Sequence, residues 1–149
     1  MNDRDLGGDK NKALRLISPG DIVCMMRVFK YKWFNHWARK DDISDAVLLD
    51  AAEEIAAGKV EADLGSCLFK KRLPRTGGGK RGGYRVIVGY KKPNRERIIF
   101  LYAFAKSDKA NMSAKEEAAL SLVAESFVST DEQQLQRLLA AGSIWEVQP

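Results

Sequence analysis

Residues 97–105, "RIIFLYAFA", restrict the possible folds of this chain more than any other segment. Every residue after the leading arginine is apolar, and most of them are β-branched or aromatic. Such residues favour extended structure, and a continuous apolar run indicates a strand that is covered on both faces. We therefore expect a central strand here, with side chains packed against it from two sides.

Residues 84–91, "YRVIVGYK", predict a second strand. Alternation places Val86 and Val88 on one face of it and Arg85 and Ile87 on the other. The connection between the two strands, "KKPNRE", contains the proline and asparagine that are typical of a tight turn. The two strands are therefore expected to form an antiparallel hairpin.

Helical patterns flank these strands. Trp33, Phe34 and Trp37 are spaced as the apolar face of a short helix, which leaves His36 on its surface. Ser44 is expected to cap a second helix that stops at Gly58. The two helices are predicted to form a hairpin-like layer.

Capping patterns predict two more helices near the C-terminus. Ser113 is followed three residues later by Glu116, which is a capping-box pattern. Thr130, with Gln133 and a closing Gly142, predicts the last helix in the same way. With further strands at "RVFKY" and "CLFKKRL", the predicted order is β-α-α-β-β-β-α-α. The expected class is α+β, with an N-terminal helical hairpin and C-terminal helices packed on a mostly antiparallel sheet.

A length of 149 residues suits a single domain, which we assign to residues 26–149. Residues 1–25 are polar, contain Gly-Gly and Pro-Gly breaks, and end at two consecutive methionines. Two interpretations of this N-terminal extension stay open. It is either a disordered or non-native upstream segment, or an ordinary element that packs on the domain.

Several function classes are disfavoured by what the chain lacks. Two cysteines and one histidine provide no metal-ligand spacing and no disulfide framework, so neither a metal nor another cofactor is expected. The glycine-rich stretch is not a Walker phosphate loop, because Pro74 stands where its first glycine belongs and Arg81 follows Lys80. No signal pattern or apolar run of about 18 residues is present, so we expect a cytoplasmic protein with no membrane association.

Positive charge is concentrated between residues 69 and 97. This segment has a formal charge of +10, because eleven basic residues stand against Glu96 alone; the whole chain carries +5, so the remainder is net −5. A basic segment on an acidic body is typical of a protein that binds a polyanion, and nucleic acid is the favoured ligand. The eleven basic residues are Lys70, Lys71, Arg72, Arg75, Lys80, Arg81, Arg85, Lys91, Lys92, Arg95 and Arg97.

Three stretches together resemble the RelE/ParE superfamily of type II toxin–antitoxin toxins, particularly its HigB/RelE-like branch. They are "KYKWFNHWARKDDISDAVLLDAAEEIAAG", "CLFKKRLPRTGGGKRGGYRVIVGYKK" and "FLYAFAKSDKANMSAKE". The resemblance implies a ribosome-dependent endoribonuclease that cuts messenger RNA without a metal and inhibits translation. It also implies a cognate antitoxin, the ribosome and messenger RNA as partners.

The resemblance carries catalytic positions onto Lys70, Arg72, Arg85 and Lys106. Lys70 and Arg72 alternate on one strand, and Arg85 on a neighbouring strand is expected to converge on them and to point away from the core. Such a cationic group would stabilise the charge that develops on a phosphorane. The other basic residues of the segment are expected to bind RNA: Lys71, Arg75, Lys80, Arg81, Lys91 and Lys92.

Three questions stay open at the level of sequence. RelE proper has a tyrosine beyond its last strand, but the matching stretch "SDKANMS" has none, so the general acid and base are unassigned. The ParE branch has the same fold and poisons DNA gyrase; the basic strand and glycine loop argue against it here. A binding module that grips RNA without cutting it would explain the charge equally well.

Overall fold

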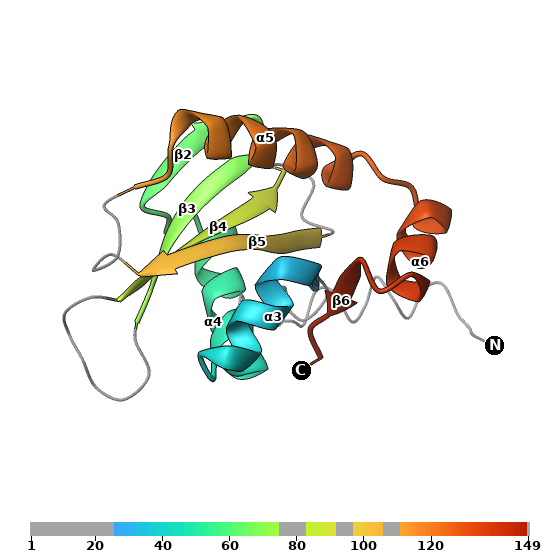
Figure 1. Cartoon of the computed structure of the whole chain (residues 1–149), viewed down its shortest axis with the longest axis horizontal. Coiled ribbons are helices and arrows are strands. Elements are labelled where there is room, and N and C mark those ends of the chain that lie inside the picture. The colour runs from blue at the N-terminus through green and yellow to red at the C-terminus, as the bar shows by residue number, and fades with distance from the viewer. Residues whose placement is uncertain (1–25, 75–82, 92–96, 106–110, 149) are drawn as a thin grey trace, which may run out of the picture.

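A computed structural model describes residues 26–74, 83–91, 97–105 and 111–148 (Figure 1). One six-stranded sheet has the order β2-β3-β4-β5-β1-β6, and within the described ranges four helices pack on it. The elements are β1 (Arg27–Tyr31), α3 (Lys32–Lys40), α4 (Asp45–Ala56), β2 (Ala62–Gly65), β3 (Leu68–Leu73), β4 (Tyr84–Tyr90), β5 (Arg97–Ala105), α5 (Ala114–Val128), α6 (Glu132–Ala140) and β6 (Ile144–Glu146).

The predicted α+β class with a mostly antiparallel sheet is confirmed. Among the strand pairs of the described residues, only β1 and β5 are parallel; β2–β3, β3–β4, β4–β5 and β1–β6 are antiparallel. The sequence interpretation missed two short strands, β2 and β6, which form the two edges of the sheet. Each has only three or four residues, which is too short for an alternation pattern to be recognised.

Two layers of helices cover the two faces of the sheet. In Figure 1, α5 lies along one face, and α3 and α4 lie on the other. Phe34, Leu48 and Val86 belong to the core under α3 and α4, whereas Ile87 and Phe127 belong to the core under α5 and α6. The predicted alternation along β4 is therefore confirmed, and all seven residues of this strand are buried.

The helix ends follow the capping patterns with one correction. The Ser44 side chain accepts a hydrogen bond from Val47 N at the start of α4, and the capping box of Ser113 and Glu116 is present in α5. The prediction that Thr130 caps α6 was wrong. Asp131 takes this position, and the Thr130 hydroxyl donates instead to the Ser126 carbonyl. Aspartate and threonine are both favourable N-cap residues, so residue type alone does not show which of these two adjacent positions caps the helix.

Helix α3 also differs from the expected pattern in one residue. Phe34 is fully buried and Trp37 packs against the same core, but Trp33 is 43% exposed. Its ring lies instead against Tyr102 of β5, with 4.7 Å between ring centroids. His36 is exposed, as predicted.

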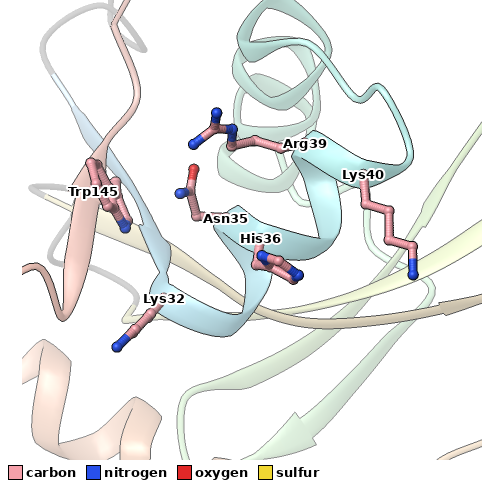
Figure 2. Close-up of a pocket in the computed structure, with 6 residues that line it drawn as sticks. All are labelled: Lys32, Asn35, His36, Arg39, Lys40 and Trp145. Carbon is pink, nitrogen blue, oxygen red and sulfur yellow. The ribbon is translucent and has the colours of Figure 1, made fainter.

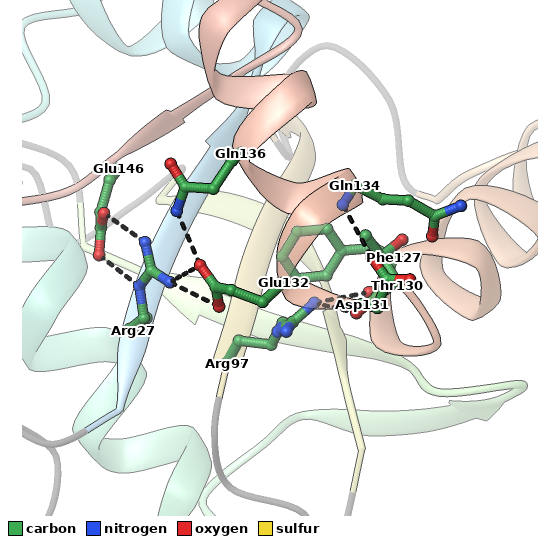
Figure 3. A network of polar contacts seen from close by, with 9 residues as sticks. All are labelled: Arg27, Arg97, Phe127, Thr130, Asp131, Glu132, Gln134, Gln136 and Glu146. Atoms are coloured by element: carbon green, nitrogen blue, oxygen red, sulfur yellow. Dashed lines mark hydrogen bonds and ion pairs between the residues drawn. The ribbon is translucent and has the colours of Figure 1, made fainter.

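An arginine on β1 holds the C-terminal elements in place. Arg27 binds both carboxylate oxygens of Glu146 on β6 at 2.9 Å and also contacts Glu132 on α6 at 3.2 Å (Figure 3). The hydrogen bond with Glu146 raises the pKa of Arg27 above its usual range. Hydrogen bonds from Gln136 and Arg27 lower the pKa of Glu132. Segments from the two ends of the domain are thereby joined at one edge of the sheet.

None of the helices in the described ranges is long and apolar enough to cross a membrane. The predicted assignment of residues 1–25 as an extension lies outside the described residues.

Candidate active site

Strand β3 presents its consecutive basic residues to opposite sides of the sheet. Lys71 lies on the side of α3 and α4, where its Nζ is 2.5 Å from Glu54 Oε1 of α4. The hydrogen bond from Lys71 lowers the pKa of Glu54. Lys70 and Arg72 point to the α5 side, where Lys70 is paired in register with Ile87. Lys71 is therefore not brought together with the other predicted site residues.

Arg85 joins Lys70 and Arg72 on the α5 side. It is directly opposite Arg72 in the β3–β4 ladder and opposite Phe104 in the β4–β5 ladder. The predicted convergence of the three cations on one face is confirmed. The expectation that Arg85 points away from the core was wrong, because the residue is only 7% exposed. Its position between two neighbouring strands, with Phe104 beside it, accounts for this burial.

Glu61 binds two of these cations and was missed at the level of sequence. Its Oε1 is 2.6 Å from Arg85 Nε, and its Oε2 is 3.5 Å from Lys70 Nζ. The residue immediately precedes the unpredicted strand β2, and its backbone N–H donates to the Lys70 carbonyl at 2.8 Å. We call Lys70, Arg72, Arg85 and Glu61 the cationic cluster. To place Glu61 in the cationic cluster from sequence, one would have to recognise β2 as a strand that pairs with β3.

Arg85 retains unused hydrogen-bonding capacity in this arrangement. Its Nη1 atom is buried and has no hydrogen-bond partner among the residues that the structure describes. A buried donor without a partner costs roughly 1–3 kcal/mol, so native proteins rarely keep one without a reason. Guanidinium groups match the spacing of phosphate oxygens, and an anion that reached this group would satisfy it.

Polar side chains from β5 and the start of α5 border the cluster. Asn111 Oδ1 accepts a hydrogen bond from Lys70 Nζ at 3.4 Å. Tyr102, which is paired with Ile87 across the β4–β5 ladder, donates its hydroxyl to Glu116 Oε2 at 3.0 Å. Lys70 and Tyr102 thus flank Ile87 on the same face. Tyr84 lies on the opposite face of the sheet, as its place next to Arg85 on the strand predicts.

The remaining predicted residues divide into two groups. Lys91 is exposed and follows the far end of β4, so it lies about 20 Å along the strand from Arg85. The others lie outside the described residues, and their roles stay predictions: Arg75, Lys80, Arg81, Lys92 and Lys106. Within the part of the chain that the structure describes, no three His, Cys, Asp or Glu side chains are grouped so as to hold a metal ion.

Comparison with models of protein families gives a match over most of the chain. A family model described as the RelE toxin of the RelE/RelB toxin–antitoxin system matches residues 26–147, which is most of the chain and all of its described elements. A search of curated proteins gave no significant match. The match begins one residue before β1 and includes every member of the cationic cluster. The chain therefore belongs to the RelE family of toxins of toxin–antitoxin systems.

Proposed function

We propose that this toxin is a ribosome-dependent endoribonuclease that cuts messenger RNA and inhibits translation without a metal cofactor. The observation that carries the proposal is the cationic cluster: three basic side chains lie on one face of adjacent strands, and two of them, Lys70 and Arg85, are paired with the Glu61 carboxylate. Membership of the family supports a toxin with an antitoxin partner. The cluster supports a site for phosphate chemistry on that toxin.

The chemistry follows from what each group can do. The RNA 2′-hydroxyl attacks the adjacent phosphorus, and the bond from phosphorus to the 5′ oxygen breaks. Arg72 is exposed and can bind the non-bridging oxygens, where charge increases in the transition state. We assign Arg85 to the same oxygens, since its buried Nη1 lacks a partner among the described residues. Donors that are held in position by strands need little rearrangement as the charge develops.

Glu61 and Lys70 are suited to move the protons. We assign Glu61 as the general base that takes the proton of the 2′-hydroxyl, and the Lys70 ammonium as the donor to the departing 5′ oxygen. The two groups are 3.5 Å apart, so the proton can return from Glu61 to Lys70 after cleavage. Glu61 also holds Arg85 in place. A cyclic phosphate and a 5′-hydroxyl are the resulting ends.

Basic residues beyond the cluster would hold the rest of the RNA. We retain Arg75, Lys80, Arg81, Lys91 and Lys92 as predicted phosphate contacts and Lys106 as a predicted catalytic neighbour. Arg75, Lys80 and Arg81 stand in or beside the glycine-rich stretch of residues 76–83. We also propose a cytoplasmic location, since both the ribosome and the antitoxin are expected there, and a place in the HigB-like branch.

Cleavage of ribosome-bound messenger RNA tests the proposal. Ribosomes carrying a defined message are incubated with the purified toxin, and the new ends are located by primer extension. A message with a 2′-deoxynucleotide at the cleavage position is the matched control. The ordinary message should be cut, the deoxy message should stay intact, and free message should be cut far more slowly.

The outcome also separates the alternatives. RNA binding without cleavage of either message would favour a binding module, and inhibition of DNA supercoiling with intact messages would favour a ParE-like gyrase poison.

Glu61→Gln tests the proposed general base, because it keeps the size of the side chain and removes its basicity. It should lower the cleavage rate and alter the dependence of that rate on pH, whereas a purely structural role would leave the pH profile unchanged.

A further inference from the structure

A second set of basic residues lies on α3, at the opposite side of the sheet from the cationic cluster. These residues line a cleft of about 610 Å³ between α3 and β6. Their spacing places them on the helix face opposite Phe34 and Ala38, which are buried. Figure 2 shows the residues of this α3–β6 cleft: Lys32, Asn35, His36, Arg39, Lys40 and Trp145.

The walls of the α3–β6 cleft are fixed by the fold. The Lys32 N–H donates to the Ser143 carbonyl at 3.0 Å, which ties the start of α3 to the chain entering β6. Trp145 is paired with Lys30 in the β1–β6 ladder. Strand β6 is an edge strand, and three strands separate it from β3, a distance of about 19 Å at the usual strand spacing. The cleft is therefore distinct from the cationic cluster.

The basic side chains of the cleft differ from their neighbours in their ion pairing within the described chain. Neighbouring basic residues have carboxylate partners, such as Lys30 with Asp45 and Arg27 with Glu146. Lys32, Arg39 and Lys40 have no such partner among the ion pairs of the described chain. A concave surface lined by unpaired positive charge attracts an anionic ligand.

Two further side chains of the cleft restrict the chemical class of anion that fits it. Trp145 is 47% exposed, although large aromatic side chains are usually buried. Asn35 is almost buried, and its carboxamide has no hydrogen-bond partner in the part of the chain that the structure describes. Figure 2 shows the Asn35 and Arg39 side chains extending from α3 toward the Trp145 side of the cleft. An aromatic face, an available amide and cations are the groups that bind a base, its edge and its phosphates.

We propose that the α3–β6 cleft is a second RNA site, which takes an unpaired nucleotide of a single-stranded segment. The base stacks on Trp145, Asn35 hydrogen-bonds to its edge, and Lys32 and Arg39 contact the adjacent phosphates. The volume is within the range of small-ligand sites, about 300–1,000 Å³. An acidic protein segment would match the charge, but it would leave the exposed ring and the amide unused.

Binding of an oligouridylate to the full chain tests this site without any requirement for cleavage. Tryptophan fluorescence is followed as RNA is added, and Trp145→Phe identifies the signal that belongs to Trp145. We expect RNA to quench this signal in the wild type and in Arg72→Ala, which alters only the cationic cluster. Arg39→Ala should weaken this binding at least about fivefold and reduce the salt dependence by about one counterion.

Arg137→Ala is the matched control, because Arg137 is an exposed arginine on α6 that forms no ion pair with another described residue. Equal RNA affinities for Arg39→Ala and Arg137→Ala, or an unchanged Trp145 signal on RNA addition, would overturn the proposal. Stronger binding of polyglutamate than of RNA at this cleft would also overturn it and would assign the surface to a protein partner. Because the readout is binding, a toxin that fails to cut RNA would not affect the result.

Discussion

Arg85 and Glu61 form a short ion pair on the α5 side of the sheet, with 2.6 Å between Nε and Oε1. The cation is the buried member of this pair, and the carboxylate, about 35% exposed, is the member that meets solvent. A buried cation depends on its partner, whereas an exposed carboxylate can be hydrated. Arg85 therefore contributes to both the folded structure and the chemistry that we propose.

Arg85→Ala should lower the free energy of unfolding by about 2–4 kcal/mol, because it removes a buried side chain and the partner of Glu61. Arg85→Met keeps most of the volume, so it should cost less. Urea unfolding of both variants measures the difference. Unfolding midpoints equal to that of the wild type would contradict the observed burial.

Lys70→Ala and Lys71→Ala remove the same charge from adjacent residues on opposite faces of β3. Lys70 contacts Glu61 in the cationic cluster, whereas Lys71 contacts Glu54 on α4. Lys70→Ala should reduce messenger RNA cleavage at least tenfold, and Lys71→Ala should reduce it only slightly. The comparison uses programmed ribosomes at equal protein concentration. Equal losses of cleavage activity in the two variants would mean that cleavage depends on the total positive charge and not on which face of β3 carries it.

Gly89→Ala should loosen the packing of α5 on β4. A Cβ added at Gly89 would lie 3.1 Å from Ala124 Cβ and 3.1 Å from Ile99 Cγ2, closer than ordinary contacts. Overpacking of this kind costs about 1–3 kcal/mol. A double-mutant cycle with Ala124→Gly isolates the contact, and we expect the two changes to be non-additive. Additive losses would show that α5 does not approach β4 at this point.

The Lys71–Glu54 pair should make a small contribution to stability that depends on pH. Pairing lowers the folded-state pKa of Glu54 below 4.5, so its stabilisation is present above pH 4.5 and is lost as pH falls through the lowered value. Because Glu54 is half exposed, the effect should stay below about 1 kcal/mol. Thermal melts of the wild type and Glu54→Gln should differ at pH 7 and converge in acid. A difference that grows in acid would contradict the pairing.

The fold class and the main strands could be predicted because their signals are local. Alternation along β4 and the apolar run of β5 follow directly from side-chain pattern, as do the Ser44 and Ser113 caps. Strands β2 and β6 could not be found in this way. They are extended mainly because they pair with β3 and β1, so tertiary contacts rather than pattern define them.

The candidate site also combines residues that local sequence signals predict with residues that only tertiary contacts bring into place. The convergence of Lys70, Arg72 and Arg85 follows from strand parity and the hairpin register, which the sequence indicates. Glu61 comes from a strand that was not recognised, and the burial of Arg85 depends on both of its neighbouring strands. An acidic residue in a polar stretch carries no local signal that it will bind two distant cations.

The cleavage rate of Arg85 variants tests the central claim most directly. Single-turnover cleavage on programmed ribosomes is measured for the wild type, Arg85→Ala, Arg85→Lys and Arg137→Ala, each at a temperature where its melting curve shows it folded. We predict a loss of at least about 100-fold for Arg85→Ala, equal to about 2.7 kcal/mol of transition-state stabilisation. Arg85→Lys should also be impaired, because an ammonium cannot bind two oxygens in a plane, and Arg137→Ala should match the wild type. Folded Arg85→Ala that cuts at the wild-type rate would contradict a catalytic role for the cationic cluster.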